Sequence, residues 1–190
     1  GIPVVICPPR DGWKPGDTEA DVLMPKGWNR VSAAKSLDLL DDYQDGDTLA
    51  MVGGYGIDVI DIDSKDGGHI DMIPEGIEVL ARHRTPSGGW HLLIRSTGIS
   101  KISPLANVDT GEKIGDYVGG TTAGSGRMLA FLPGSKRPKY DTDYTIEKPL
   151  DFSQISGSAD ATAVSWLLHN GGSSQGKETQ ESDEVAAAEW

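Results

Sequence analysis

The sequence predicts an α+β protein with mixed or antiparallel sheets and flanking helices. Short apolar runs bounded by glycine or proline recur along the chain, whereas only two segments have helical spacing. Two extended runs also flank the turn at Pro86-Ser87-Gly88-Gly89, as in a β-hairpin. Many strands with few helices favour an α+β fold over a doubly wound parallel sheet.

The first helix is expected after Ser32, whose hydroxyl suits an N-cap, and it continues to about Tyr43. A second helix is expected over 161–169, and the segment 8–30, rich in Pro, Gly, Asp and Trp, is expected to be a long loop. The expected strands are 2–7, 48–52, 57–63, 77–84, 90–95, 114–118, 128–132 and 144–147.

The chain is acidic, but its charge is unevenly distributed. It has 17 Lys and Arg against 29 Asp and Glu, which gives a net charge of −12. Residues 1–81 carry 6 basic and 16 acidic side chains, residues 82–148 carry 10 and 6, and residues 149–190 carry 1 and 7. The acidic total argues against a nucleic-acid partner, whereas the middle segment, with a net charge of +4, does not.

The single cysteine, Cys7, excludes an internal disulfide and indicates a reducing, cytoplasmic compartment. No apolar run approaches the ~18 residues of a membrane-spanning helix, so no membrane partner is expected. Because Cys7 stands alone and His69, His83 and His169 are scattered, no zinc site is expected.

Paired carboxylates on a strand are the strongest local feature. In the run 58–63, alternation places Asp61 and Asp63 on one face and Ile60 and Ile62 on the other, while Asp58 shares the face of the isoleucines. The Cα atoms of Asp61 and Asp63 would be roughly 7 Å apart. Hard oxygen ligands on a rigid strand suit Mg²⁺ or Mn²⁺. The alternative interpretation is an acidic, solvated strand edge.

The hairpin turn Ser87-Gly88-Gly89 leads directly into Trp90 and His91. Small residues in a turn allow backbone N–H groups to converge on an anion, and Ser87 adds a hydroxyl donor. His91 could donate to the same phosphate or protonate a leaving group. The alternative is an ordinary hairpin with a histidine on one strand.

A third acid, Asp116, lies in a short extended stretch bounded by Gly115 and Gly119, and Arg127 follows a glycine-rich loop. An isolated Asp in such a stretch is usually a turn residue. Asp116 becomes a metal-ligand candidate only if the sheet places it beside Asp61 and Asp63.

The order of these motifs resembles the primase–polymerase branch of the archaeo-eukaryotic primase superfamily, which occurs in phage and plasmid replication proteins. The Pro133-Gly134-Ser135 run, the opening residues 1–4 and the segment 25–28 also resemble that family. The resemblance covers about residues 1–150. It implies an archaeo-eukaryotic primase-like catalytic core with an RRM-like element.

By this resemblance, Asp61, Asp63 and Asp116 would hold two Mg²⁺ or Mn²⁺ ions. Ser87 and His91 would hold the triphosphate of the incoming nucleotide, with Gly88 and Gly89 shaping that loop. Arg127 would neutralise phosphate. Asp58 matches no ligand position.

The implied function is a DNA primase and DNA polymerase that transfers nucleotides from nucleoside triphosphates to a 3′-hydroxyl on a single-stranded DNA template. Residues 1–152 would form this catalytic domain, 153–170 would carry a C-terminal helix and 171–190 would be a flexible acidic linker. A helicase domain on the same polypeptide is expected, in the bacterial host cytoplasm if a phage encodes the protein. Two alternatives are a metal-dependent glycosyltransferase that uses an Asp-x-Asp pair, and a non-catalytic module that binds DNA or a helicase during replication.

Overall fold

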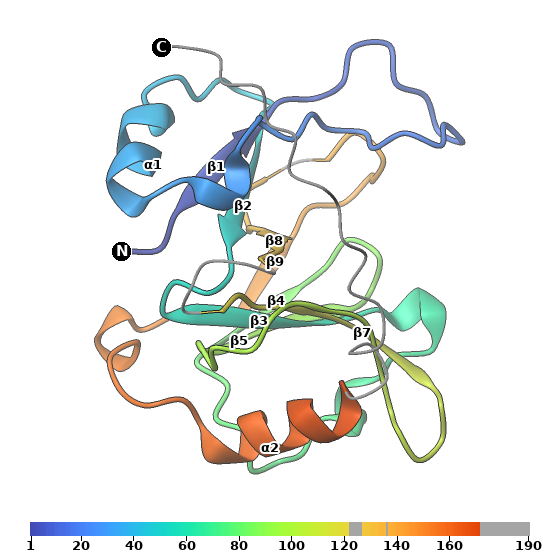
Figure 1. Cartoon of the computed structure of the whole chain (residues 1–190). Coiled ribbons are helices and arrows are strands. Elements are labelled where there is room, and N and C mark those ends of the chain that lie inside the picture. The colour runs from blue at the N-terminus through green and yellow to red at the C-terminus, as the bar shows by residue number, and fades with distance from the viewer. Residues whose placement is uncertain (122–126, 136, 172–190) are drawn as a thin grey trace, which may run out of the picture.

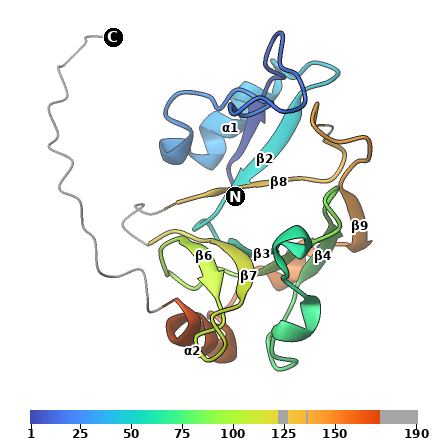
Figure 2. The ribbon, with the colours of Figure 1, turned by 90° about the vertical axis from the view of Figure 1, so that its right-hand side faces the viewer.

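A three-stranded and a six-stranded antiparallel sheet, each accompanied by one α-helix, make up this α+β fold in the residues that the computed structural model describes, 1–121, 127–135 and 137–171 (Figure 1). Figures 1 and 2 show the smaller sheet with α1 in the upper part of the molecule and the larger sheet below it, with α2 underneath. The expected fold class is therefore confirmed.

The smaller sheet has the strand order β1 (Val4–Cys7), β2 (Thr48–Val52) and β8 (Leu129–Phe131). The helix α1 (Ala33–Leu40) is fixed to β1 through Ser36, whose hydroxyl donates to the Val4 carbonyl and accepts from the Val4 amide. Ser32 caps α1 as expected, accepting a hydrogen bond from the Lys35 amide. The helix ends at Leu40, three residues before the expected end.

The larger sheet contains, in spatial order, β6 (Ile102–Ala106), β7 (Lys113–Val118), β3 (Ile57–Ile62), β5 (Trp90–Arg95), β4 (Ala81–Arg84) and β9 (Thr145–Lys148). Short 3₁₀ turns cover Trp28–Arg30, Ser64–Asp66, Ile70–Met72 and Phe152–Gln154. The helix α2 (Ala161–Asn170) packs on one face of this sheet. The segment 153–170, which was expected to carry a C-terminal helix, thus contributes α2 to the hydrophobic core of the larger sheet.

The faces of β3 are divided as its sequence predicts. Ile60 and Ile62 lie in the core that includes Tyr117 and α2, whereas Val59 lies in the core shared with the smaller sheet. Asp61 alternates with the isoleucines and so faces the smaller sheet. Asp58 is buried on the isoleucine side and accepts a hydrogen bond from the Tyr117 hydroxyl.

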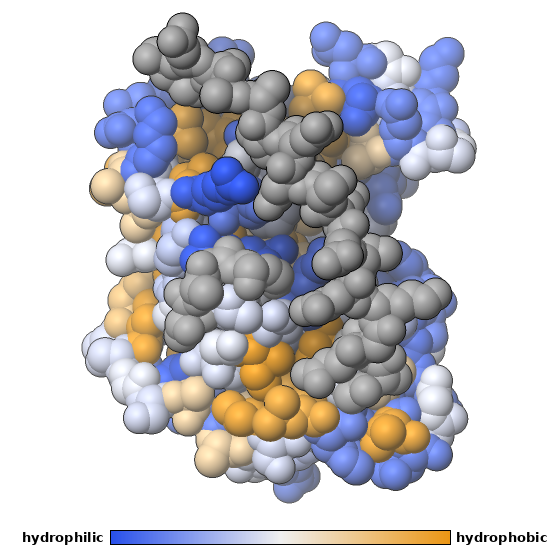
Figure 3. All heavy atoms as spheres, viewed as in Figure 1, coloured by the Kyte–Doolittle hydropathy of each residue, from blue (hydrophilic) through white to orange (hydrophobic). Residues whose placement is uncertain are grey.

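One face of the molecule exposes apolar side chains (Figure 3). In Figure 3 apolar residues gather at the bottom, over α2, while much of the remaining coloured surface is hydrophilic. Ala163 and Leu167 of α2 are buried against the sheet, and Leu168 on its outer side is exposed. No helix in the described ranges is both long and apolar enough to cross a bilayer.

Some expected elements differ from the structure. Residues 77–80 precede β4 as irregular chain, and β6 was not expected, because its sequence contains Pro104. The expected loop 8–30 has a buried anchor, Asp21, which forms an ion pair with Arg137. Most of the expected linker, 172–190, lies outside the described residues.

Two segments that leave one sheet for the other pack closely against each other at a crossing of glycine residues. The β2–β3 connection contains Gly53 and Gly54, and Gly120 follows β7. A Cβ atom on Gly54 would lie 2.9 Å from the Cα atom of Gly120, and Gly54 has a φ of 87°. A side chain at this crossing would therefore push the two sheets apart and would also strain its own backbone.

We expect Gly54→Ala to lower the free energy of unfolding by about 2–4 kcal/mol, because it adds a steric clash to the strain of a left-handed backbone. The matched control is Gly46→Ala, where φ is 97° and no atom lies within 4 Å of the added Cβ. That variant should lose only about 1–2 kcal/mol. Urea unfolding of both variants measures the difference, and equal losses would show that the crossing is not tight.

Candidate active site

A row of polar side chains crosses the larger sheet on the face that looks toward the smaller one. Asp61 on β3 is the direct cross-strand partner of His91 on β5 and of Asp116 on β7, and His83 on β4 pairs with His91. Direct partners in antiparallel strands share a face, with Cβ atoms about 4.5–5.5 Å apart. The sheet therefore brings together three of the residues singled out from the sequence, Asp61, His91 and Asp116.

Asp61 is the central residue of this row. Its side chain is 28% exposed. Burial, together with the neighbouring charges of Asp63 and Asp116, raises the pKa of Asp61 to about 7. A carboxylate held under such conditions binds a proton or a cation more readily than an ordinary surface Asp.

His91 is buried, with 4% of its surface exposed. Its Nε2 lies 3.4 Å from Oδ1 of Asp61, its ring forms a hydrogen bond with the backbone of Phe131, and the Tyr144 ring is 5.4 Å away. Burial lowers the pKa of His91 to about 3, so the imidazole is neutral at pH 7. In this structure His91 contacts and orients Asp61 rather than offering a positive charge.

The hairpin turn uses most of its own backbone donors. The Gly88 amide donates to the Thr85 carbonyl, and the Gly89 amide donates to the Thr85 hydroxyl, which also contacts Ser87 Oγ at 3.1 Å. A Cβ on Gly89 would overlap the Ile62 carbonyl, so glycine permits the close approach of β5 to β3. Among the groups expected to bind phosphate, the Ser87 hydroxyl is partly buried and contacts the Thr85 hydroxyl.

Asp63 follows the last residue of β3 and is held by two lysines. Its Oδ1 lies 3.7 Å from the Lys65 Nζ, and its Oδ2 lies 3.4 Å from the Lys113 Nζ. Asp116 accepts a hydrogen bond of 2.7 Å from the Ser103 hydroxyl. Each of the three carboxylates thus has a separate protein partner.

The three carboxylates are chemically suitable ligands for a divalent ion, but their oxygen atoms do not converge on one point. Within the described ranges, no group of three or more His, Cys, Asp or Glu side chains is close enough to hold a metal. Three carboxylates at one end of a sheet are hard ligands of the kind that Mg²⁺ and Mn²⁺ prefer. Because burial and like charge raise the pKa of Asp61, an added cation there would be stabilised. The residues fit the ions provided that Asp63 and Asp116 turn from their present partners.

Arg127 lies apart from the row. Its guanidinium stacks 3.9 Å from the ring centroid of Tyr55 and donates to the Asn29 carbonyl at 2.9 Å, beside the glycine crossing. Arg137 is the arginine near the row, because its side chain bonds Tyr144, which packs on His91. It is anchored by Asp21 and stacks on Phe131.

Three contacts near the row were missed by the sequence reasoning. They are the hydroxyl of Ser103 on Asp116, the ammonium of Lys65 on Asp63, and the ring of Tyr144 on His91. Lys65 was recognisable only by its position two residues after Asp63. Ser103 and Tyr144 reach the row through tertiary pairing, for which the sequence carries no local signal.

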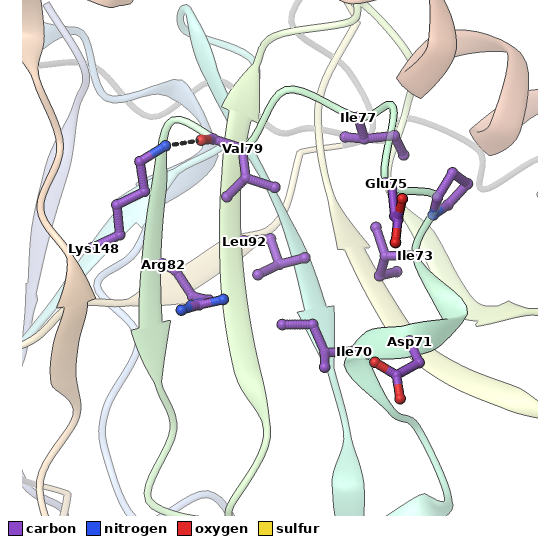
Figure 4. A pocket seen from close by; sticks show the side chains of 10 residues that line it. Ile70, Asp71, Ile73, Glu75, Ile77, Val79, Arg82, Leu92 and Lys148 are labelled. Carbon is purple, nitrogen blue, oxygen red and sulfur yellow. Dashed lines mark hydrogen bonds between the residues drawn. The ribbon is translucent and has the colours of Figure 1, made fainter.

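A pocket of about 640 Å³ lies on the other face of the sheet. Figure 4 shows Arg82 and Leu92 on its strand side, with Ile70 and Ile73 opposite. None of the residues that line it belongs to the polar row. This pocket is therefore separate from the candidate site at the row.

Compared with models of known protein families, the chain matches none, and no curated protein matches it either. The functional conclusion accordingly depends on the residues and their geometry.

The raised pKa of Asp61 predicts how stability depends on pH without metal. Between about pH 4 and pH 7 the folded chain keeps a proton that the unfolded chain has released, so the free energy of unfolding falls as pH rises through this range. Asp61→Asn should remove this decline. We expect its melting temperature at pH 8 to exceed that of the wild type by about 3 °C or more, and the difference to be clearly smaller at pH 5 and to vanish near pH 4.

Thermal unfolding in EDTA at both pH values measures this effect. The control is Asp109→Asn, because Asp109 is exposed in the turn between β6 and β7. A wild-type advantage at pH 8 would contradict the assignment of Asp61 as a strained carboxylate.

Proposed function

We propose that this chain is the catalytic domain of a metal-dependent nucleotidyltransferase of the primase–polymerase type. The observation that carries the proposal is the register of three strands, which aligns His91, Asp61 and Asp116 in one row on the face between the sheets. A D-x-D glycosyltransferase would need only the carboxylate pair, so the third acid in register favours nucleotidyl transfer. As part of this proposal, the fold would be an archaeo-eukaryotic primase-like core, with the larger sheet as its RRM-like element.

The reaction would join a 3′-hydroxyl to the α-phosphorus of a bound nucleoside triphosphate, with pyrophosphate as the leaving group. Asp61, Asp63 and Asp116 would hold two Mg²⁺ or Mn²⁺ ions, which supply activation of the attacking oxygen and stabilisation of the leaving oxygen. His91 would pack against Asp61 as a neutral imidazole, with Nε2 3.4 Å from Oδ1. Ser87, beside the end of β3, would contact the triphosphate.

Single-stranded DNA template and primer are the proposed macromolecular substrates. The segment 82–148 supplies the net positive charge of +4 that a phosphate backbone requires nearby. A helicase domain on the same polypeptide and action in the cytoplasm of a bacterial host remain part of the proposal, on the strength of the resemblance to phage and plasmid replication proteins.

The test is nucleotide incorporation on single-stranded DNA with labelled nucleoside triphosphates and Mg²⁺ or Mn²⁺. Asp61→Ala and Asp116→Ala should each reduce incorporation at least about a hundredfold, because each removes a ligand of the reacting ions. The matched control Asp109→Ala removes an exposed carboxylate and should retain wild-type activity.

Products formed without a primer would establish priming, and extension of a primer would establish polymerase activity. Wild-type protein that incorporates no nucleotide under either condition, while folded by circular dichroism, would sink the proposed function.

A further inference from the structure

Asp63 is the one predicted metal ligand whose carboxylate is neutralised on both oxygens by cations of the protein. Lys65 Nζ lies 3.7 Å from Oδ1, and Lys113 Nζ lies 3.4 Å from Oδ2. The Asp63 side chain is 17% exposed, whereas those of Lys65 and Lys113 are 54% and 34% exposed. The carboxylate is therefore fixed inside the site while both ammonium groups reach solvent.

The two lysines come from different elements that meet beside the hairpin turn. Lys65 belongs to the 3₁₀ turn that follows β3, and its neighbour Ser64 donates a hydrogen bond of 3.0 Å to the Gly88 carbonyl. Lys113 is the first residue of β7, three residues before Asp116. The two ammonium groups thus meet at Asp63, at the end of β3, and the turn that carries Lys65 also contacts the hairpin.

Lys113 has a second partner that keeps it at this place. Its Nζ lies 2.5 Å from Oδ2 of Asp66, and this bond is the main cause of the raised pKa of Lys113. The lysine therefore stays charged at neutral pH. If Asp63 turns toward another cation, Asp66 still holds Lys113 beside the site.

We propose, on the basis of the proposed function, that Lys65 and Lys113 exchange partners during substrate binding. Without metal they neutralise Asp63. If a divalent ion took the Asp63 carboxylate, Lys65 would lose this partner and Lys113 would keep Asp66, and the N–H donors released from Asp63 would bind the oxygens of the triphosphate. A carboxylate has a limited number of acceptor positions, so the ion and the lysines compete for Asp63, whereas the lysines and the polyphosphate attract each other.

This exchange predicts opposite changes in two equilibrium constants. Lys113→Met removes a competitor for Asp63, so Mn²⁺ alone should bind about threefold to tenfold more tightly. The same variant lacks a cation for the polyphosphate, so inorganic triphosphate, added with saturating Mn²⁺, should bind about tenfold more weakly. Lys113→Arg, which keeps the charge, should give values near those of the wild type for both.

Electron paramagnetic resonance of free Mn²⁺ measures the first constant, and isothermal titration calorimetry with inorganic triphosphate measures the second. Lys35→Met is the control, because Lys35 is exposed on α1 and its loss changes the net charge by the same amount. It should leave both constants unchanged. The Lys65→Met variant should change both constants in the same directions as Lys113→Met.

The outcomes separate this inference from the proposed function. Wild-type protein that binds Mn²⁺ and triphosphate, with both constants weakened or both unchanged in Lys113→Met, would overturn the exchange alone. Wild-type protein that binds no Mn²⁺ would overturn the metal site and the exchange together. Tighter Mn²⁺ binding with weaker triphosphate binding supports the exchange, because loss of folding would weaken both.

Discussion

The antiparallel register of β5, β3 and β7 is the constraint on which both the core and the candidate site depend. It aligns His91, Asp61 and Asp116 on one face, and the same alternation buries Ile60 and Ile62 on the other. A shift of β3 by one residue would turn every side chain to the opposite face. The apolar residues that stabilise the sheet therefore also fix the polar row, and the site needs no separate scaffold.

Much of the fold could be predicted because its signals are local. The alternation in β3, the Ser32 cap and the hairpin before β5 are each encoded within a few residues, and all three are present in the structure. What could not be predicted depends on pairing across the chain. The division of the strands between two sheets is one example, and β6, which is paired only through β7, is another.

The candidate site shows the same limit. Asp61 and Asp116 are about 55 residues apart in the sequence. Nothing in the immediate neighbourhood of Asp116 indicated a site residue, and it was proposed only because of its place in an ordered set of motifs. Arg127 belonged to the same set but lies beside the glycine crossing, because stacking on Tyr55 and a bond to Asn29 hold it there. The order of the motifs thus predicted that Asp61 and Asp116 share a sheet face, but it did not predict where the side chain of Arg127 lies.

The electrostatics of Asp61 differ from those of Asp58, the other acid on the same strand. Burial and like charge raise the pKa of Asp61 to about 7, so the ionised carboxylate opposes the folded state. By contrast, buried Asp58 accepts hydrogen bonds from Gly54, Ser96, Thr97 and Tyr117 and ties together the chain at the crossing. Both acids lie on β3 and burial raises the pKa of both, but Asp58 is surrounded by hydrogen-bond donors, whereas Asp61 faces the like charges of Asp63 and Asp116. The proposed divalent ion would offset this repulsion among the three carboxylates, and a proton on Asp61 offsets part of it without metal.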